Sequence, residues 1–357
     1  MPKNFIDAIL KEYYPDEWET ISDAPVIDYL KRKTKSVNKE SKARGSFANL
    51  YAIYVLVEDY INQGYHTSEK SYSDYVGADY TPLLNRQREL RFGSKLQNHA
   101  LNSRLNEEFY KFHEIHPIRR DVNKGKYWIN EEILIVEGIN IAPVILKIID
   151  QYIALKSENF TSFFAECLHF SDNVSQNPEE AKNFVLDQLA PDVDARIFEI
   201  VSFCILKYSY LNENFSFLDE QQNLIHQSKV LYKTGRTNAN DGGIDFILIP
   251  QGRVYQVTET LDFKKYFLDI DKLNKFPITF VVKSNETSQQ IFEEISEASR
   301  VNMPNEEIRS KYLDCFEEII SIPLLEGHLQ NVIVNGKFPD MIQELVVQCK
   351  VEFNIEE

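Results

Sequence analysis

Residues 234–259 read TGRTNANDGGIDFILIPQGRVYQVTE, and they decide the fold class of the C-terminal half. Two apolar runs, IDFILI and RVYQVTE, are separated only by the Pro-Gln-Gly tripeptide at 250–252, which is typical of an antiparallel hairpin. The Gly-Gly pair at 242–243 permits a tight turn immediately before Asp245. The segment therefore predicts a β-hairpin with a carboxylate at its entrance.

Polar residues on the second strand complete a candidate site. Gln256 follows Asp245 by eleven residues, and Thr258 lies two further on. Because side chains alternate along a strand, Gln256 and Thr258 share a face, and the hairpin brings that face beside Asp245. Upstream, Glu199 lies on a predicted helix that can pack across the sheet. The plainer interpretation is that Asp245 ends a turn and that the others are ordinary inward polar groups.

The segments around the hairpin predict a mixed α/β core. The short run KVLYK precedes it, and the predicted helix 195–211, with Asp194 as its cap, comes earlier. After the hairpin, the pattern predicts a helix over 264–276, a strand over 277–283 and a helix over 288–300. The order is therefore helix, strand, strand, helix, strand, which is typical of a mixed sheet flanked by helices.

This order resembles the PD-(D/E)xK nuclease superfamily. In that superfamily a helix carries an acid, one strand carries Asp, and the next strand carries (E/Q)-x-K. The GG-x-D form with Gln in the second position is similar to the Mrr-like branch. Together with KTKSVNKESKARGSFANLYAIYVLVEDYI at 33–61, the sequence resembles a type II restriction endonuclease family over most of the chain.

The resemblance implies roles for individual residues. Glu199 matches the helix acid, Asp245 the invariant acid and Gln256 the second metal ligand, and the backbone carbonyl of Val257 contributes a further oxygen. Carboxylate and carbonyl oxygens are the ligands that Mg²⁺ prefers, and the metal polarises the phosphate and lowers the pKa of bound water. The implied cofactor is therefore Mg²⁺.

The sequence departs from the family pattern at the position of the usual lysine. Thr258, followed by Glu259, stands where a lysine normally orients or activates the attacking water. We expect a lysine from elsewhere to replace it, and Lys264 is the predicted residue. Three other lysines are alternatives, namely Lys265, Lys283 and Lys233. A β-bulge that turns Glu259 inward as an extra ligand is a further alternative.

The N-terminal half predicts a mostly helical DNA-reading part. A helix or helix pair over 94–112 precedes two short strands, Ile118–Asp121 and Lys126–Ile129, around a turn. A helix followed by a short basic hairpin is the order of a winged helix. The predicted domains are a DNA-recognition domain over 1–140, a helical connector over 141–190 and a nuclease domain over 191–357.

The net charge of −16 argues against nucleic acid, but its distribution does not. Residues 1–150 carry 21 Lys and Arg against 22 Asp and Glu, whereas residues 151–357 carry 18 against 33. A locally basic surface is therefore compatible with the N-terminal half.

Basic and amide side chains supply the candidate DNA contacts. For the run from Lys31 to Arg44 the alternatives are phosphate contact and a solvated charged loop, and for 95–104 they are base-edge contact and a polar helix face. The predicted DNA-binding residues are Lys31, Arg32, Lys33, Lys35, Lys42, Arg44, Arg86, Lys95, Gln97, Asn98, Arg104, Arg119, Arg120, Lys124, Arg236, Asn238 and Asn240.

The expected function is Mg²⁺-dependent cleavage of a specific double-stranded DNA sequence. The resemblance further implies a homodimer, because palindromic sites match a two-fold protein, and a cognate DNA methyltransferase as genetic partner. The alternatives are a DNA-binding protein with a decayed nuclease core and a nuclease that requires modified DNA. No transmembrane helix or signal peptide is expected, so we expect a cytoplasmic protein without membrane partners.

Overall fold

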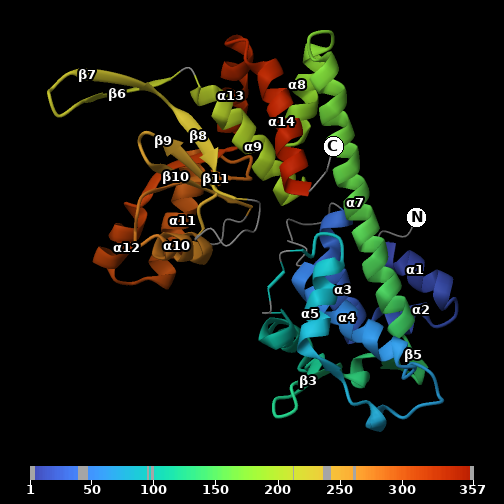
Figure 1. Ribbon diagram of the computed structural model, residues 1–357. Coiled ribbons are helices and arrows are strands. Elements are labelled where there is room, and N and C mark those ends of the chain that lie inside the picture. Colours follow the sequence, from blue (N-terminus) through green and yellow to red (C-terminus); the bar gives the residue numbers. More distant parts are fainter. Residues whose placement is uncertain are drawn as a thin grey trace. The chain divides into compact units, whose positions relative to one another are not determined.

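The computed structural model describes residues 5–38, 47–94, 96–97, 100–211, 213–235, 243–259 and 263–353. The chain divides into two compact units, Met1–Phe160 and Thr161–Glu357. The division falls inside α7 (Ala142–Asn173), which begins the predicted helical connector (Figure 1). Residues 157–161, around the division, include neither Pro nor Gly, so nothing interrupts the helix there.

The first unit is mostly helical and packs around α4 (Phe47–Asn62). Eleven of the 16 residues of α4 are buried, and they lie on all sides of the helix, as expected for a helix inside a core. The other elements are α1 (Phe5–Tyr13), α2 (Trp18–Ser22), α3 (Pro25–Thr34), η1 (Lys35–Asn38), η2 (Tyr72–Asp74), α5 (Tyr80–Glu89), η3 (Ala100–Arg104), α6 (Leu105–His113), η4 (Glu131–Ile133), β4 (Ile135–Val136) and β5 (Ile139–Asn140).

A small antiparallel sheet of this unit contains β1 (Ala78–Asp79), β2 (Ile118–Asp121) and β3 (Lys126–Ile129), in the order β1-β3-β2. The bounds of β2 and β3 are those that the sequence predicts. Asn106 of α6 forms two hydrogen bonds of 2.9 Å with β2: its amide nitrogen donates to the carbonyl of Ile118, and its amide oxygen accepts the N–H of Ile118. The β2–β3 hairpin is therefore held against the helix that precedes it.

The second unit contains a five-stranded mixed sheet, in the order β12-β11-β10-β9-β8. Its strands are β8 (Val230–Lys233), β9 (Phe246–Ile249), β10 (Arg253–Thr258), β11 (Ile278–Val282) and β12 (Phe316–Ser321). The first three pair antiparallel, whereas β10, β11 and β12 pair parallel. The predicted hairpin and the predicted α/β class with a mixed sheet are confirmed.

Helices flank both faces of this sheet (Figure 1). On one face, Val254 and Phe280 pack with residues of α10 (Phe263–Lys272) and α11 (Ser288–Asn302). On the other face, Phe203 of α9 (Ala195–Tyr210) lies 5.2 Å from Phe246 between ring centroids. The remaining helices are α8 (Pro178–Asp187), α12 (Glu306–Leu313), α13 (Ile322–Val334) and α14 (Phe338–Phe353). Within the described residues, no helix has both the length and the apolar character needed to cross a membrane.

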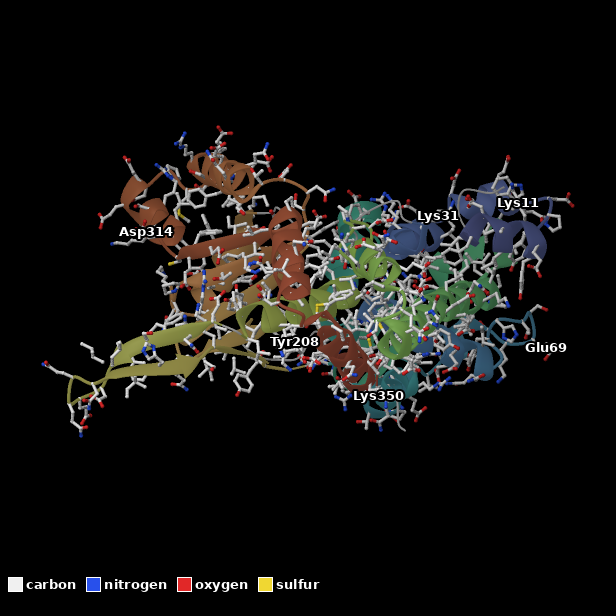
Figure 2. All side chains as sticks on the ribbon, turned by 90° about the horizontal axis from the view of Figure 1, so that it is seen from above. Lys11, Lys31, Glu69, Tyr208, Asp314 and Lys350 are labelled. Atoms are coloured by element: carbon white, nitrogen blue, oxygen red, sulfur yellow. The ribbon has the colours of Figure 1, made fainter. Side chains whose placement is uncertain are left out.

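A two-stranded ribbon, β6 (Asn214–Leu218) paired with β7 (Leu224–Ser228), projects from the second unit (Figure 1, Figure 2). No pattern in the sequence predicts it, and all but one of its ten strand residues are exposed. At its tip, Asp219 accepts hydrogen bonds from the backbone N–H groups of Gln221 and Asn223, at 2.9 and 2.8 Å. The hydrogen bonds from Asn223 lower the pKa of Asp219, so the turn stabilises itself locally.

Candidate active site

The candidate site lies where β9 begins and β10 ends. Asp245 immediately precedes β9, and its N–H donates to the carbonyl of Tyr255 at 2.9 Å. One carboxylate oxygen of Asp245 accepts the backbone N–H of Val257 at 2.6 Å. The carboxylate is therefore fixed directly beside the strand that carries Gln256 and Thr258.

Gly243 brings the turn before Asp245 close to both β10 and α10. Its φ is +90°, a left-handed conformation that glycine adopts without strain. A Cβ on Gly243 would stand 3.4 Å from Cδ of Lys272, 3.6 Å from Oε1 of Gln256 and 3.8 Å from Oδ1 of Asp269. Gln256 of the strand and Asp269 of the helix thus approach the same point of the turn.

Gln256 and Thr258 occupy the face of β10 that α10 covers, in different environments. The Gln256 amide nitrogen donates to the carbonyl of Val257 at 3.2 Å, while its Oε1 is buried without a hydrogen-bond partner among the described residues. Thr258 is 1 % exposed, and its hydroxyl accepts a hydrogen bond from Nζ of Lys265 at 2.7 Å. A buried carbonyl oxygen that lacks a donor is an oxygen suited to a cation.

One side of α10 presents charged residues at this site. Lys265, Asp269 and Lys272 follow one another at intervals of four and three residues, which places them on one helical face. Asp269 is 3 % exposed, and Lys272 lies 2.7 Å from its Oδ1. Burial and then the charge of Asp269 raise the pKa of Tyr266, so that phenol stays neutral. A buried carboxylate is costly unless it is paired, as it is here.

Lys264, the lysine that the sequence predicts for the site, is exposed, and its Nζ lies 6.0 Å from the ring centroid of Phe263. Neighbouring helical residues point about 100° apart, so only one of Lys264 and Lys265 can face β10. Lys265 takes the position beside Thr258. Asp269 is not among the residues predicted for the site, although a charged residue among the apolar residues of a helix is a signal that the sequence contains.

Glu259 lies on the opposite face of the sheet from Gln256 and Thr258. It forms a buried ion pair with Lys283, and Lys283 also donates to the carbonyl of Val193. Instead of turning inward as a ligand, Glu259 continues the alternation of β10, so it points away from Thr258. Lys283 is thereby also placed away from the candidate site.

Glu199 lies on α9, which covers that same opposite face. Its carboxylate lies 3.1 Å from Nζ of Lys233, and Glu352 approaches the same nitrogen at 3.8 Å. The structure therefore places Glu199 in an ion pair rather than beside Gln256, and Lys233 lies with it. Of the predicted ligand set, Asp245, Gln256 and the carbonyl of Val257 remain together.

These atoms fit a hard cation such as Mg²⁺. The oxygens of this region come from Asp245, Asp269, the unpartnered Oε1 of Gln256 and the carbonyl of Val257, and oxygen is the donor type that Mg²⁺ prefers. Across the described residues, no group of three or more His, Cys, Asp or Glu side chains gathers in a metal-binding arrangement. Two carboxylates supplemented by an amide and a backbone oxygen would hold such an ion.

In the first unit, several predicted DNA-contact residues pair with acids of the chain. Lys31 lies 2.9 Å from Asp7, and Arg32 lies 2.8 Å from Asp28. The same holds for Lys33 with Glu108, Arg86 with Glu58 and Lys124 with Asp121. These partners reduce the positive charge that the run beginning at Lys31 offers to phosphate.

The β2–β3 hairpin presents cations more openly. Arg119 and Arg120 are exposed, and their guanidinium carbons lie 5.9 and 5.0 Å from the ring centroids of Tyr72 and Tyr127. The other exposed predicted residues of this unit are Arg32, Lys35, Gln97, Arg104 and Lys124. Seven predicted contacts lie outside the described residues, namely Lys42, Arg44, Lys95, Asn98, Arg236, Asn238 and Asn240.

Comparison of the chain with protein-family models, curated proteins and solved structures gives no significant match.

Proposed function

We propose that this chain is a Mg²⁺-dependent endonuclease acting on double-stranded DNA, of the type II restriction kind. The observation that carries the proposal is the position of Asp245 at the entrance of β9, hydrogen-bonded to β10 beside Gln256. The order α9, β8, β9, β10, α10, β11 supports a PD-(D/E)xK-like core, since an antiparallel meander is followed by a helical crossover to a parallel strand.

The residues of the site suit hydrolysis of a phosphodiester. Water forms a new bond to phosphorus and releases a proton to solvent, while the ester bond breaks and the leaving oxygen takes up a proton. Asp245, Gln256 and the Val257 carbonyl would hold Mg²⁺, which stabilises charge on the phosphate and lowers the pKa of bound water. The Lys265 ammonium, 2.7 Å from the Thr258 hydroxyl, adds a positive charge at the site.

The first unit supports a winged-helix arrangement for DNA recognition. The order β1, α5, α6, β2, β3 with the sheet order β1-β3-β2 places a hairpin directly after the helix that would enter the major groove. In this proposal α6 and η3 present Arg104 to the bases, and β2 presents Arg119 and Arg120 to phosphates. A homodimer on a palindromic site and a genetically linked methyltransferase belong to the same proposal.

The first expected result concerns cleavage itself. Purified protein incubated with unmethylated phage-sized DNA is expected to give discrete bands with Mg²⁺ and intact DNA with EDTA, as seen on a gel. Sequencing the ends of the fragments then gives the site. Intact DNA in both reactions would contradict the proposal, and cleavage of methylated DNA alone would assign a modification-dependent nuclease.

A second candidate is a DNA-binding protein with a decayed nuclease core. Thr258 in the position of the usual lysine favours it, because that strand then lacks the ammonium that acts on water. The contact between Lys265 and Thr258 weighs against it, since a lysine still reaches the position. Specific DNA binding without Mg²⁺-dependent cleavage would favour this candidate.

The two exposed arginines of the β2–β3 hairpin lead to a separate prediction about DNA affinity. Replacing both Arg119 and Arg120 by Ala is expected to weaken DNA binding and to lower the slope of log affinity against log salt by about 2, since each phosphate contact contributes roughly one unit. Fluorescence anisotropy across a salt series measures the slope. Arg300→Ala is the control, because Arg300 is an exposed arginine of α11 outside the predicted DNA contacts. An unchanged slope in the double variant would exclude this hairpin from the interface.

A further inference from the structure

The two polar positions of β10 that face α10 carry no charge. Gln256 is a neutral amide and Thr258 a hydroxyl, so the strand alone supplies neither a second carboxylate beside Asp245 nor an ammonium. Both charges are present on the facing helix. Lys265 donates to the hydroxyl of Thr258 at 2.7 Å. A Cβ on Gly243 would lie 3.8 Å from Oδ1 of Asp269 and 3.6 Å from Oε1 of Gln256.

We propose that α10 supplies the two charged groups of the active site, with Lys265 as the catalytic ammonium and Asp269 as the second carboxylate of the metal site. This inference rests on the proposed nuclease function. Lys265 and Asp269 are four residues apart, so one helical face presents both to β10. Lys265 thus takes the role of the lysine that the family pattern places two residues after Gln256. Asp269 supplies the negative charge that the neutral Gln256 lacks.

Burial supports a functional role for Asp269. Its carboxylate is 3 % exposed, and its partner Lys272 has a side chain that is 45 % exposed. Burying a carboxylate lowers the stability of the folded state, because the charge loses its hydration. An apolar residue would pack in the same place without that cost, so packing alone does not explain Asp269. Its Oδ1 and the unpartnered Oε1 of Gln256 lie 3.8 and 3.6 Å from the place that a Cβ on Gly243 would take, so two oxygen donors face the same turn.

The test of Lys265 moves the lysine from α10 to β10. Lys265→Met is expected to lower the cleavage rate on the order of 10²-fold or more, since positioned proton-transfer and charge-stabilising groups contribute that much. Lys264→Met, which changes the exposed neighbour, is expected to cleave like the wild type. Thr258→Lys combined with Lys265→Met is expected to recover at least about tenfold of the lost rate, because the ammonium returns from the strand.

Urea unfolding of each variant establishes that the rates compare folded proteins. Lys265→Met cleaving at the wild-type rate would overturn the assignment of Lys265. A folded double variant that recovers none of the lost cleavage rate would overturn the claim that a lysine on the strand can take the role of Lys265. Wild-type protein that fails to cleave DNA at all would instead overturn the proposed function.

The test of Asp269 does not depend on cleavage. Asp269→Asn is expected to weaken binding of Mn²⁺, used as a probe for Mg²⁺, by about tenfold or more in calorimetry, because one anionic ligand is lost. Asp271→Asn is the matched control, since Asp271 lies on the same helix as Asp269, is half exposed and pairs with Lys275 beyond the end of that helix. Equal affinity in Asp269→Asn and the wild type, or no binding by the wild type, would overturn this assignment.

Discussion

Replacing Asp245 by Asn is expected to reduce Mg²⁺-dependent DNA cleavage on the order of 10³-fold or more, with DNA affinity retained. The substitution removes one of the two negative charges at the site, and charge stabilisation by a bound metal contributes several kcal/mol to such a reaction. The fold is expected to persist, because the Asn side-chain oxygen can still accept the N–H of Val257 that Asp245 accepts at 2.6 Å. Initial cleavage rates and fluorescence anisotropy separate the two effects.

The matched control for Asp245→Asn is Asp314→Asn. Asp314 is an exposed acid of the same unit, at the end of α12 (Figure 2), and its loss is expected to leave cleavage unchanged. Cleavage by Asp245→Asn at the wild-type rate would remove Asp245 from the site. Loss of both cleavage and the cooperative urea transition would instead assign Asp245 a structural role.

Replacing Lys283 by Met is expected to lower the free energy of unfolding by about 3–5 kcal/mol. Lys283 is 1 % exposed and Glu259 is 7 % exposed, so the substitution leaves a buried carboxylate without its cation. Removing one partner of a buried ion pair has this large cost because the remaining charge loses its counter-ion in a place that water reaches poorly. The carbonyl of Val193 also loses the hydrogen bond that Lys283 donates. Urea unfolding measures the difference.

Two further variants test that explanation. Glu259→Gln added to Lys283→Met is expected to recover a large part of the lost stability, because a neutral amide then replaces the buried carboxylate that has lost its counter-ion. Lys311→Met is the control, since Lys311 pairs with Glu307 at the surface and is expected to change stability by less than about 1 kcal/mol. A loss below about 1 kcal/mol in Lys283→Met would contradict the structural role assigned to the pair.

Local patterns predict the secondary structure well. The bounds of β2 and β3, the β9–β10 hairpin and the cap of α9 all follow from apolar periodicity and turn chemistry. The Asp194 side chain accepts the N–H of Arg196 at 3.0 Å, as its position before the helix predicts. Such patterns do not predict the β6–β7 ribbon, because a strand that is exposed on both faces has no alternation of apolar and polar residues.

The candidate site is only partly predictable for a related reason. Asp245, Gln256 and Thr258 lie within one hairpin, so their proximity follows from the sequence. The partner of Thr258, by contrast, depends on the rotation of α10, which decides between Lys264 and Lys265. Ion pairs distant in sequence, such as Lys33 with Glu108, depend on tertiary packing that one sequence does not reveal.

The β6–β7 ribbon has a consequence for how the second unit moves. Its strands form a sheet of their own, and their exposed side chains contribute almost nothing to the core. A two-stranded hairpin with so little burial is marginally stable in water. We therefore expect the ribbon to open at a lower free energy than the five-stranded sheet. A cut or an inserted label near Asp219 would leave Asp245 and its neighbours in place.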